Sequence, residues 1–289
     1  MNTKSKNKEN KTREIFDKLI DGINNIIISG EYERFLKFNK NFHNYSFNNI
    51  ILIFSQMKEA TQVAGFKTWQ KMGRKIKKGA KGIQIVYPIK RKYTTKIDGQ
   101  RSIIDKEEQQ QEEKNIEYMT YGYTYVYDIS QTIGEPMPLE NKRLNSNSKI
   151  EFWEFLKSFS PYPILEESLR PNLQGYWSKS KKHIVLEKTL KIDDKVSVLL
   201  HELTHALYDD FDYKQDRNLS ETFVESVAFM VADYFGLDTS MCSFNYITSW
   251  VNGDIKILLE LGAKIQKTAD AFINQLEKEF ESKNIRIAS

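Results

Sequence analysis

The stretch Val196-Ser197-Val198-Leu199-Leu200-His201-Glu202-Leu203-Thr204-His205 decides how the second half of this 289-residue chain folds. The apolar residues ahead of the first histidine predict a buried helix. On a helix, His201 and His205 are four residues apart and point the same way, so their imidazoles can bind one Zn²⁺. Glu202 lies on the same turn, where it can take a proton from metal-bound water. The motif predicts a hydrolytic metal centre with one Zn²⁺ per chain, or another divalent metal such as Mn²⁺.

A catalytic zinc site needs a third protein ligand and an open position for water. No third histidine follows at the spacing that some metallopeptidases use. The next helix, from Ser220 onward, carries Glu221 and Glu225 on one face of an otherwise apolar segment. Buried acids need a partner, which a metal supplies. We assign Glu221 as the third ligand and Glu225 as the acid that holds a histidine ring by a hydrogen bond. The reverse assignment stays open, as does a solvated helix face.

The segments around the motif predict a mostly helical region with a small sheet. Two short strands, 173–177 and 183–186, are joined by a lysine-rich turn, and an edge strand of this kind can hold a substrate peptide in extended form. His183 is more simply a strand histidine than a ligand. Three tyrosines could stabilise the oxyanion of a transition state: Tyr176, Tyr208 and Tyr213. The expected helices cover residues 148–159, 192–209, 218–236 and 254–282.

The first half of the chain predicts an α+β unit. Apolar residues recur at helical spacing from Thr12 to Lys40, a second helix is expected over 47–57, and alternating strands run from Ile83 toward Tyr93 and from Ile116 to Asp128. Residues 98–114 are expected to be the solvated tip of this hairpin. The polar segment 134–148 is the best linker, so we expect a disordered tail over 1–10 and two domains, 11–140 and 141–289.

Positive charge is concentrated in the first half. Residues 1–140 carry 24 basic and 17 acidic side chains, and from Lys67 to Lys96 there are 11 basic residues and no acidic one. Such a block indicates a polyanionic partner or a solvated basic face. Its glycine-rich centre, Gly73 to Gly82, allows close approach of the backbone to phosphate.

Single-stranded nucleic acid is gripped by cations along its phosphates and by aromatic rings under its bases. Both kinds of residue are interleaved here, and Tyr121, Tyr123, Tyr125 and Tyr127 share one strand face, which could equally be core. Trp69 could stack on a base or anchor the short helix that contains it. The expected contacts with single-stranded DNA are Tyr45, Asn48, Trp69, Lys71, Arg74, Lys75, Lys77, Lys78 and Lys81.

The N-terminal motifs resemble those of ArdC-type antirestriction proteins. The resemblance rests on Tyr45–Leu52, Thr61–Trp69, Gly73-Arg74, Lys77–Ile83 and Tyr127–Thr132, in this order along the chain. It implies a domain that binds single-stranded DNA. The second half is similar to the zincin domain of that family and to ImmA/IrrE-like metallopeptidases, in which the helix from Glu221 to Ala228 completes the metal site. The family also implies a mobile-element protein that helps transferred DNA, as in plasmid conjugation, to escape restriction.

The first function expected is therefore single-stranded DNA binding together with zinc-dependent peptide hydrolysis. One alternative is a metalloprotease that cleaves a repressor, tethered to DNA by its basic half. Another is a DNA-binding protein without catalysis, whose metal site is structural or latent. The single cysteine, Cys242, and the lack of an apolar leader or long apolar run favour a cytoplasmic protein that has no membrane partner.

Overall fold

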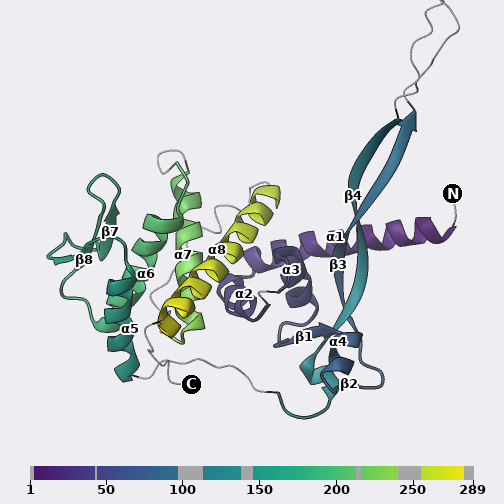
Figure 1. The fold of residues 1–289 in the computed structure, drawn as a ribbon, viewed down its shortest axis with the longest axis horizontal. Coiled ribbons are helices and arrows are strands. Elements are labelled where there is room, and N and C mark those ends of the chain that lie inside the picture. The colour runs from purple at the N-terminus through teal and green to yellow at the C-terminus, as the bar shows by residue number, and fades with distance from the viewer. Residues whose placement is uncertain are drawn as a thin grey trace, which may run out of the picture.

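The computed structural model describes residues 3–42, 44–96, 113–137, 146–212, 216–237, 239 and 255–282. The molecule is elongated, with a helical body whose far end carries a small sheet and with a long β-ribbon projecting from the other end (Figure 1). The fold is α+β, as the sequence predicted. The elements in chain order are α1 (Thr3–Ile28), α2 (Tyr32–Asn39), η1 (Lys40–Phe42), α3 (Phe47–Gln56), β1 (Val63–Gly65), α4 (Phe66–Lys71), β2 (Lys75–Ile76), β3 (Ile83–Lys96), β4 (Glu113–Asp128), η2 (Ile129–Gln131), β5 (Thr132–Ile133), α5 (Ser146–Phe159), β6 (Ile164–Glu167), β7 (Gly175–Ser178), β8 (His183–Glu187), α6 (Ile192–Tyr208), α7 (Arg217–Tyr234) and α8 (Ile255–Ser282).

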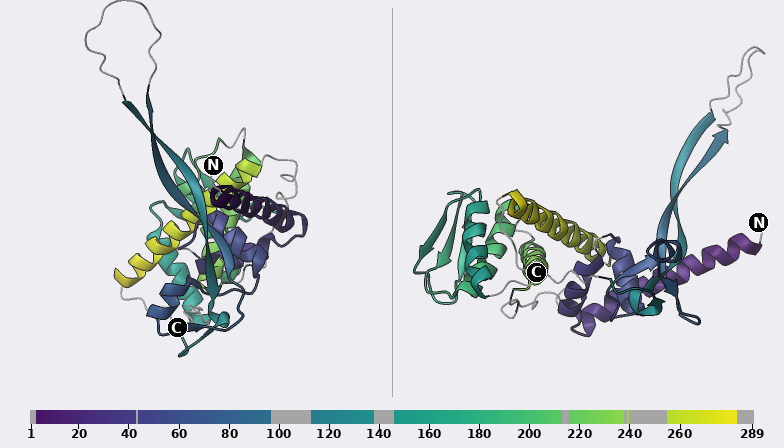
Figure 2. Two further views of the ribbon diagram at one scale, coloured as in Figure 1. Left: turned by 90° about the vertical axis from the view of Figure 1, so that its right-hand side faces the viewer. Right: turned by 60° about the horizontal axis from the view of Figure 1, so that its bottom comes forward.

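The predicted hairpin is the ribbon of β3 and β4. These strands pair antiparallel from Ile83 opposite Val126 to Lys96 opposite Glu113, and the ribbon rises well clear of the helices (Figure 2). At its base, β1 pairs with β4 to complete a three-stranded sheet in the order β1-β4-β3. Helices α1 and α3 cover this base and bury Ile83, Ile85 and Val126 in one hydrophobic cluster. Most of the tip predicted at 98–114 lies outside the described residues.

The first helix differs from its prediction at both ends. It begins at Thr3, where the sequence predicted a disordered tail, because no proline or glycine interrupts the residues before Gly22 and extending a helix is easier than nucleating one. The periodic segment expected to run to Lys40 breaks at Gly30, whose φ of 70° is left-handed. Gly22 itself permits close packing, since a Cβ there would lie 2.9 Å from Ile51 Cγ2 of α3.

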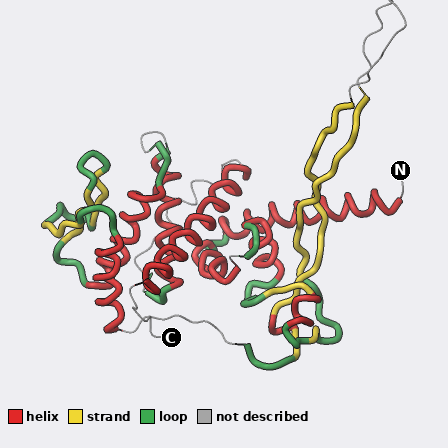
Figure 3. The backbone as a smooth tube through the Cα atoms, in the orientation of Figure 1, coloured by secondary structure: helices red, strands yellow, loops and turns green. Residues whose placement is uncertain are grey.

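The second half contains α5 to α8 and a three-stranded sheet in the order β6-β8-β7. This sheet and the ribbon lie at opposite ends of the molecule (Figure 3). β7 and β8 pair antiparallel as expected, whereas β6, which pairs parallel with β8, was not predicted. Its sequence, Ile-Leu-Glu-Glu, is too short and too polar to stand out as a strand. Within the described part of the chain, no helix is long and apolar enough to cross a membrane.

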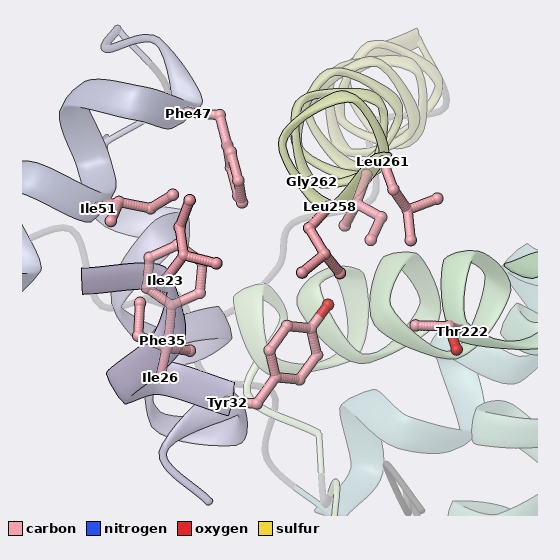
Figure 4. A pocket seen from close by; sticks show the side chains of 11 residues that line it. Ile23, Ile26, Tyr32, Phe35, Phe47, Ile51, Thr222, Leu258, Leu261 and Gly262 are labelled. Carbon is pink, nitrogen blue, oxygen red and sulfur yellow. The ribbon is translucent and has the colours of Figure 1, made fainter. Parts of the chain in front are cut away.

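The two halves pack directly against each other through α2, α3, α7 and α8. Tyr32 contacts the hydrophobic clusters of both halves, and its hydroxyl lies 2.9 Å from Ser226 Oγ on α7. Phe47 presses its ring on Gly262 of α8, where a Cβ would lie 2.0 Å from Phe47 Cζ. Between these contacts is a cavity of about 50 Å³ with an apolar lining, into which Leu258 also points (Figure 4). The domain boundary predicted near residue 141 lies outside the described residues, and the division into domains stays a prediction.

Candidate metal centre and cationic turn

The two histidines of the motif are held by a helix whose apolar side is fully buried. Leu199, Leu200 and Leu203 have no exposed surface, so α6 is fixed in the core on that side. His201 and His205 lie on the opposite side with ring centroids 4.9 Å apart. The local sequence therefore places both imidazoles on the side of α6 that faces away from the core, toward a cleft described below.

Glu221 of α7 completes a cluster of three ligand atoms. Its Oε2 lies 3.6 Å from His201 Nε2 and 3.7 Å from His205 Nε2, and one donor atom from each of the three residues falls within 4.8 Å of the others. Bonds of about 2.1 Å in tetrahedral geometry would separate two ligand atoms by about 3.4 Å. The donor set and its spacing fit a divalent metal ion with His-His-Glu ligation.

Each imidazole has a carboxylate on its second nitrogen. Glu225 Oε2 lies 3.0 Å from His201 Nδ1, and Asp209 Oδ2 lies 2.8 Å from His205 Nδ1. Such bonds fix the tautomer and turn Nε2 of each ring toward the metal position. Asp209 is itself fixed, because it accepts hydrogen bonds from Ser220 Oγ at 2.6 Å and from the N–H of Phe211 at 3.1 Å.

The sequence predicts Glu225 beside a histidine, whereas the role of Asp209 emerges from the structure. The signal was present, because Asp209 follows His205 by four residues, the spacing that brings two side chains of a helix together. It was overlooked because α6 ends at Tyr208, so Asp209 is its C-cap rather than a member of its periodic pattern.

The charged groups of this centre shift one another's pKa. Burial disfavours the imidazolium of His201, but hydrogen bonds with Glu221 and Glu225 outweigh it and raise its pKa to about 10. Burial also opposes protonation of His205, yet Asp209 and Glu221 raise its pKa. Burial alone would raise the pKa of Asp209, but its bonds to His205 and Ser220 lower it. The carboxylates around the two imidazoles therefore favour positive charge on the rings.

Glu202 is buried beside the two histidines and is 7% exposed. Burial raises the pKa of its carboxyl group. The neighbouring imidazoles of His201 and His205, and then a hydrogen bond from the backbone N–H of Trp177 on β7, favour the ionised form and oppose this rise in pKa. A glutamate whose pKa is moved toward neutrality, next to a metal position, suits the role of general base.

A cleft of about 800 Å³ opens over these residues. Its lining includes Tyr176, one of the predicted oxyanion stabilisers, from the edge strand β7. The hydroxyl of Tyr208 instead donates to Gln275 Oε1 at 2.8 Å. Tyr213 lies outside the described residues, and His183 stands on β8 without lining the cleft.

Two predicted DNA contacts in the first half are buried. Trp69 is 2% exposed and its Nε1 donates to the carbonyl of Tyr127 at 2.8 Å, so it is the core anchor of α4, and its ring has no face open to a base. Arg74 is 8% exposed and donates from Nε to Thr132 Oγ1 at 2.7 Å and from its guanidinium to the carbonyl of Glu135. The burial of Trp69 favours its alternative role as a core anchor, and the burial of Arg74 argues against a contact with phosphate.

The remaining cations stand on a fixed backbone. We define the cationic turn as residues Lys75–Lys81. Gly79 adopts a φ of 84° in it, and Gln131 Nε2 donates to the carbonyl of Lys81 at 2.8 Å. The amines of Lys71, Lys75, Lys78 and Lys81 are exposed, and Lys77 Nζ donates to the carbonyl of Ser130 at 2.7 Å. Among the described residues, no carboxylate lies within 4 Å of these amines.

Asp128 organises the frame below this turn. Its carboxylate is 1% exposed and accepts the backbone N–H groups of Thr61, Gln62 and Ser130 at 2.8, 3.1 and 2.9 Å. With Gln131 it forms a capping box on η2. The Tyr127–Thr132 motif therefore has a structural role. Tyr45 and Asn48 are half-buried, and the Tyr45 hydroxyl donates to the carbonyl of Val63 at 2.9 Å.

The comparisons with known proteins agree with the N-terminal motifs. Residues 6–127 match the model of the N-terminal domain of the anti-restriction factor ArdC. This region is an ArdC N-terminal domain. The resemblance drawn from the motifs is therefore confirmed. Helices α1 to α4, the ribbon and the cationic turn lie in this ArdC domain, apart from residues 3–5 at the start of α1 and Asp128 at the end of β4.

Similarity to whole proteins extends beyond the ArdC domain. An uncharacterized protein of Bacillus anthracis is 29% identical over 311 aligned positions, which cover 96% of this chain and 53% of that protein. The chain thus spans about half the length of this curated relative. The metal-free crystal structure of antirestriction ArdC from plasmid R388 has a TM-score of 0.52 at 18% identity and covers 82% of this chain and 86% of that one. Its Mn(II)-bound form has a TM-score of 0.50 at 17% identity, with 84% and 86% covered. The likeness shows that both halves share the ArdC fold.

Proposed function

We propose that this protein is a zinc-dependent peptidase joined to a domain that binds single-stranded DNA, and that it acts in antirestriction. One observation carries the peptidase: His201, His205 and Glu221 converge within 4.8 Å, beside a buried glutamate and under an open cleft. A structural metal site would need neither the buried glutamate nor the cleft. This favours catalysis over the structural or latent alternative.

In the proposed hydrolysis, different residues of the chain have different roles. A divalent ion bound by the three ligands would supply Lewis-acid activation of a water molecule and of the substrate carbonyl. Glu202 accepts the proton of the attacking water and passes it to the departing amine. Glu225 and Asp209 hold the imidazoles, and the edge of β7 offers main-chain groups to an extended substrate. Of the three tyrosines that the sequence offered as oxyanion stabilisers, Tyr176 lines the cleft, and we assign it this role.

The DNA-binding part of the proposal rests on the ArdC domain and its exposed side chains. The cationic turn supplies exposed amines without acidic neighbours, and the frame under it fixes their backbone. Four aromatic side chains of the same domain are exposed and open to stacking: Phe66 at 58%, Tyr121 at 44%, Tyr87 at 41% and Tyr125 at 39%. Cations and rings of this kind bind single strands with little sequence preference.

The role in antirestriction is supported by what the similar proteins are. The matching family model describes an anti-restriction factor, and the similar crystal structures are of an antirestriction protein from a plasmid. A protein of this kind would travel with a mobile element and meet restriction when the element enters a new cell.

Metal content and hydrolysis of the full chain test the peptidase directly. Wild-type protein should bind about one Zn²⁺ and cleave a protein substrate in host lysate. Glu202→Gln should keep the metal and lose cleavage by at least about a hundredfold, because general base catalysis contributes 10²–10⁴. His201→Ala should lose both. Cleavage by Glu202→Gln at the wild-type rate, or full metal content in His201→Ala, would refute the proposed centre.

A further inference from the structure

A group of cations lines the cleft beside the metal centre. Arg170, Lys179 and Lys182 line the same cleft as His201 and Glu202. We define these three residues as the basic rim. Lys179 and Lys182 belong to the tight turn between β7 and β8, where Lys182 adopts a φ of 51°. All three side chains are exposed, so the turn holds positive charge at the end of the edge strand.

The carboxylates of the cleft are engaged elsewhere. Glu221 faces the two histidines, Asp209 holds His205, and Glu202 is buried against β7. Among the described residues, no carboxylate lies within 4 Å of the cationic groups of the basic rim. The charge that a substrate meets beyond the metal ligands is therefore positive.

The open edge of β7 gives a substrate its direction. Within the described residues, β7 pairs with β8 on one side and with no strand on the other, since the order of the sheet is β6-β8-β7. Gly175 brings the strand against α6, because a Cβ there would lie 2.6 Å from Val198 Cγ1. A peptide that extends β7 would pass over Glu202, and its side chains would meet the basic rim where the strand ends at Ser178.

We propose that the metal cleft selects extended peptides that carry aspartate or glutamate on the side of the scissile bond next to Lys179 and Lys182. This inference rests on the proposed peptidase function and names its substrate class. The open edge of β7 can hydrogen-bond to the main chain of an extended peptide, and a nucleic acid has no main chain of this kind. The carboxylates of the peptide pair with the amines of the rim, which steers the substrate and sets its register on β7.

Binding to an inactive enzyme tests the selectivity without requiring hydrolysis. The full-length Glu202→Gln protein, loaded with Zn²⁺, is titrated against three fluorescein-labelled peptides of equal length that carry acidic, neutral or basic residues on one side of a common centre. Fluorescence anisotropy should show the acidic peptide binding about tenfold more tightly than the neutral one, since two exposed ion pairs contribute modestly. The difference should shrink at high salt.

Charge reversal of the rim gives the second arm. Lys179→Glu/Lys182→Glu, made in the same protein, should reverse the preference between the acidic and basic peptides. Lys278→Glu, an exposed lysine on α8 outside the cleft, should leave it unchanged. A thermal melt of each variant controls for folding. If Lys179→Glu/Lys182→Glu melts early, Lys179→Gln/Lys182→Gln replaces it, and this neutral variant should lose the preference for the acidic peptide.

The outcomes separate the selectivity from the peptidase itself. Equal binding of all three peptides, with cleavage by the wild-type protein intact, would overturn the basic rim as a selector and leave the peptidase standing. Both proposals would be overturned if no peptide binds and if a single-stranded oligonucleotide does bind in a way that depends on Lys179 and Lys182. The proposal is supported if the preference between acidic and basic peptides reverses in Lys179→Glu/Lys182→Glu and does not change in Lys278→Glu.

Discussion

The metal centre and the cationic turn hold charge in opposite ways. At the metal centre the side chains themselves are fixed: each imidazole is clamped by a carboxylate, and Asp209 is in turn bound by Ser220 and Phe211. At the cationic turn the amines are exposed, and the backbone beneath them is fixed by Asp128 and Gln131. A single change of a functional side chain should therefore matter at the metal centre. At the turn, the frame should matter more than any one amine.

The largest effect is expected from the frame of the turn. Trp69→Ala removes a buried indole and its hydrogen bond to the carbonyl of Tyr127, so it should lower the free energy of unfolding by about 3–5 kcal/mol. Thermal or urea unfolding of the full chain measures this loss. A variant that melts like the wild type but binds DNA less would restore the stacking role that the burial of Trp69 argues against.

Reversing the charge of three lysines in the cationic turn should change DNA binding and leave folding intact. Lys75→Glu/Lys77→Glu/Lys78→Glu should flatten the dependence of log K on log salt by about 2, at about 0.7 per phosphate contact. Titration of a single-stranded oligonucleotide at several salt concentrations gives this slope.

The matched control for that slope is Lys188→Glu/Lys267→Glu/Lys278→Glu. It makes the same change of net charge at exposed lysines of the other half. Equal slopes for the two triple variants would mean that net charge, and not the cationic turn, drives binding.

At the metal centre, one substitution outside the ligand set should already be measurable. Asp209→Asn keeps the shape of the side chain but removes the charge that orients His205, so zinc affinity should fall by about 10- to 100-fold. Competition with a chelator measures it. Asp210→Asn, at the exposed neighbouring acid, is the control, and an unchanged affinity in Asp209→Asn would show that its hydrogen bond does not tune the metal site.

The metal centre could be predicted from sequence because its signals are local. His201, Glu202 and His205 lie within one helical turn and a half, and Glu221 and Glu225 repeat the same spacing on one other helix. The exposed lysines of the turn were also visible as a run of charge. Burial, by contrast, depends on distant residues: Trp69 bonds to Tyr127, and Arg74 bonds to Thr132 and Glu135. The burial of Arg74 could not be predicted from its neighbours, and for Trp69 the sequence left the core and stacking roles open.

The contacts between the two halves could not be predicted from the sequence either. The place of Gly262 in α8 is explained by the ring of Phe47, more than 200 positions earlier in the chain. Neither residue belongs to a motif. The parallel pairing of β6 with β8 also joins segments that no turn connects. Sequence patterns specify local structure well, and they leave open which buried faces meet.

The smallest effect tests which aromatic side chain of α4 meets a base. Phe66 and Trp69 are one turn apart, but Phe66 is 58% exposed and Trp69 is 2% exposed. Phe66→Ala should therefore weaken binding of a single-stranded oligonucleotide by about 1 kcal/mol, the low end for one stacked base, and leave the melting temperature unchanged. Ile150→Ala, which truncates an apolar residue 56% exposed on α5, should alter neither quantity. If Phe66→Ala binds DNA like the wild type, the aromatic contact must come from the ribbon, where Tyr87, Tyr121 and Tyr125 are exposed rings to substitute next.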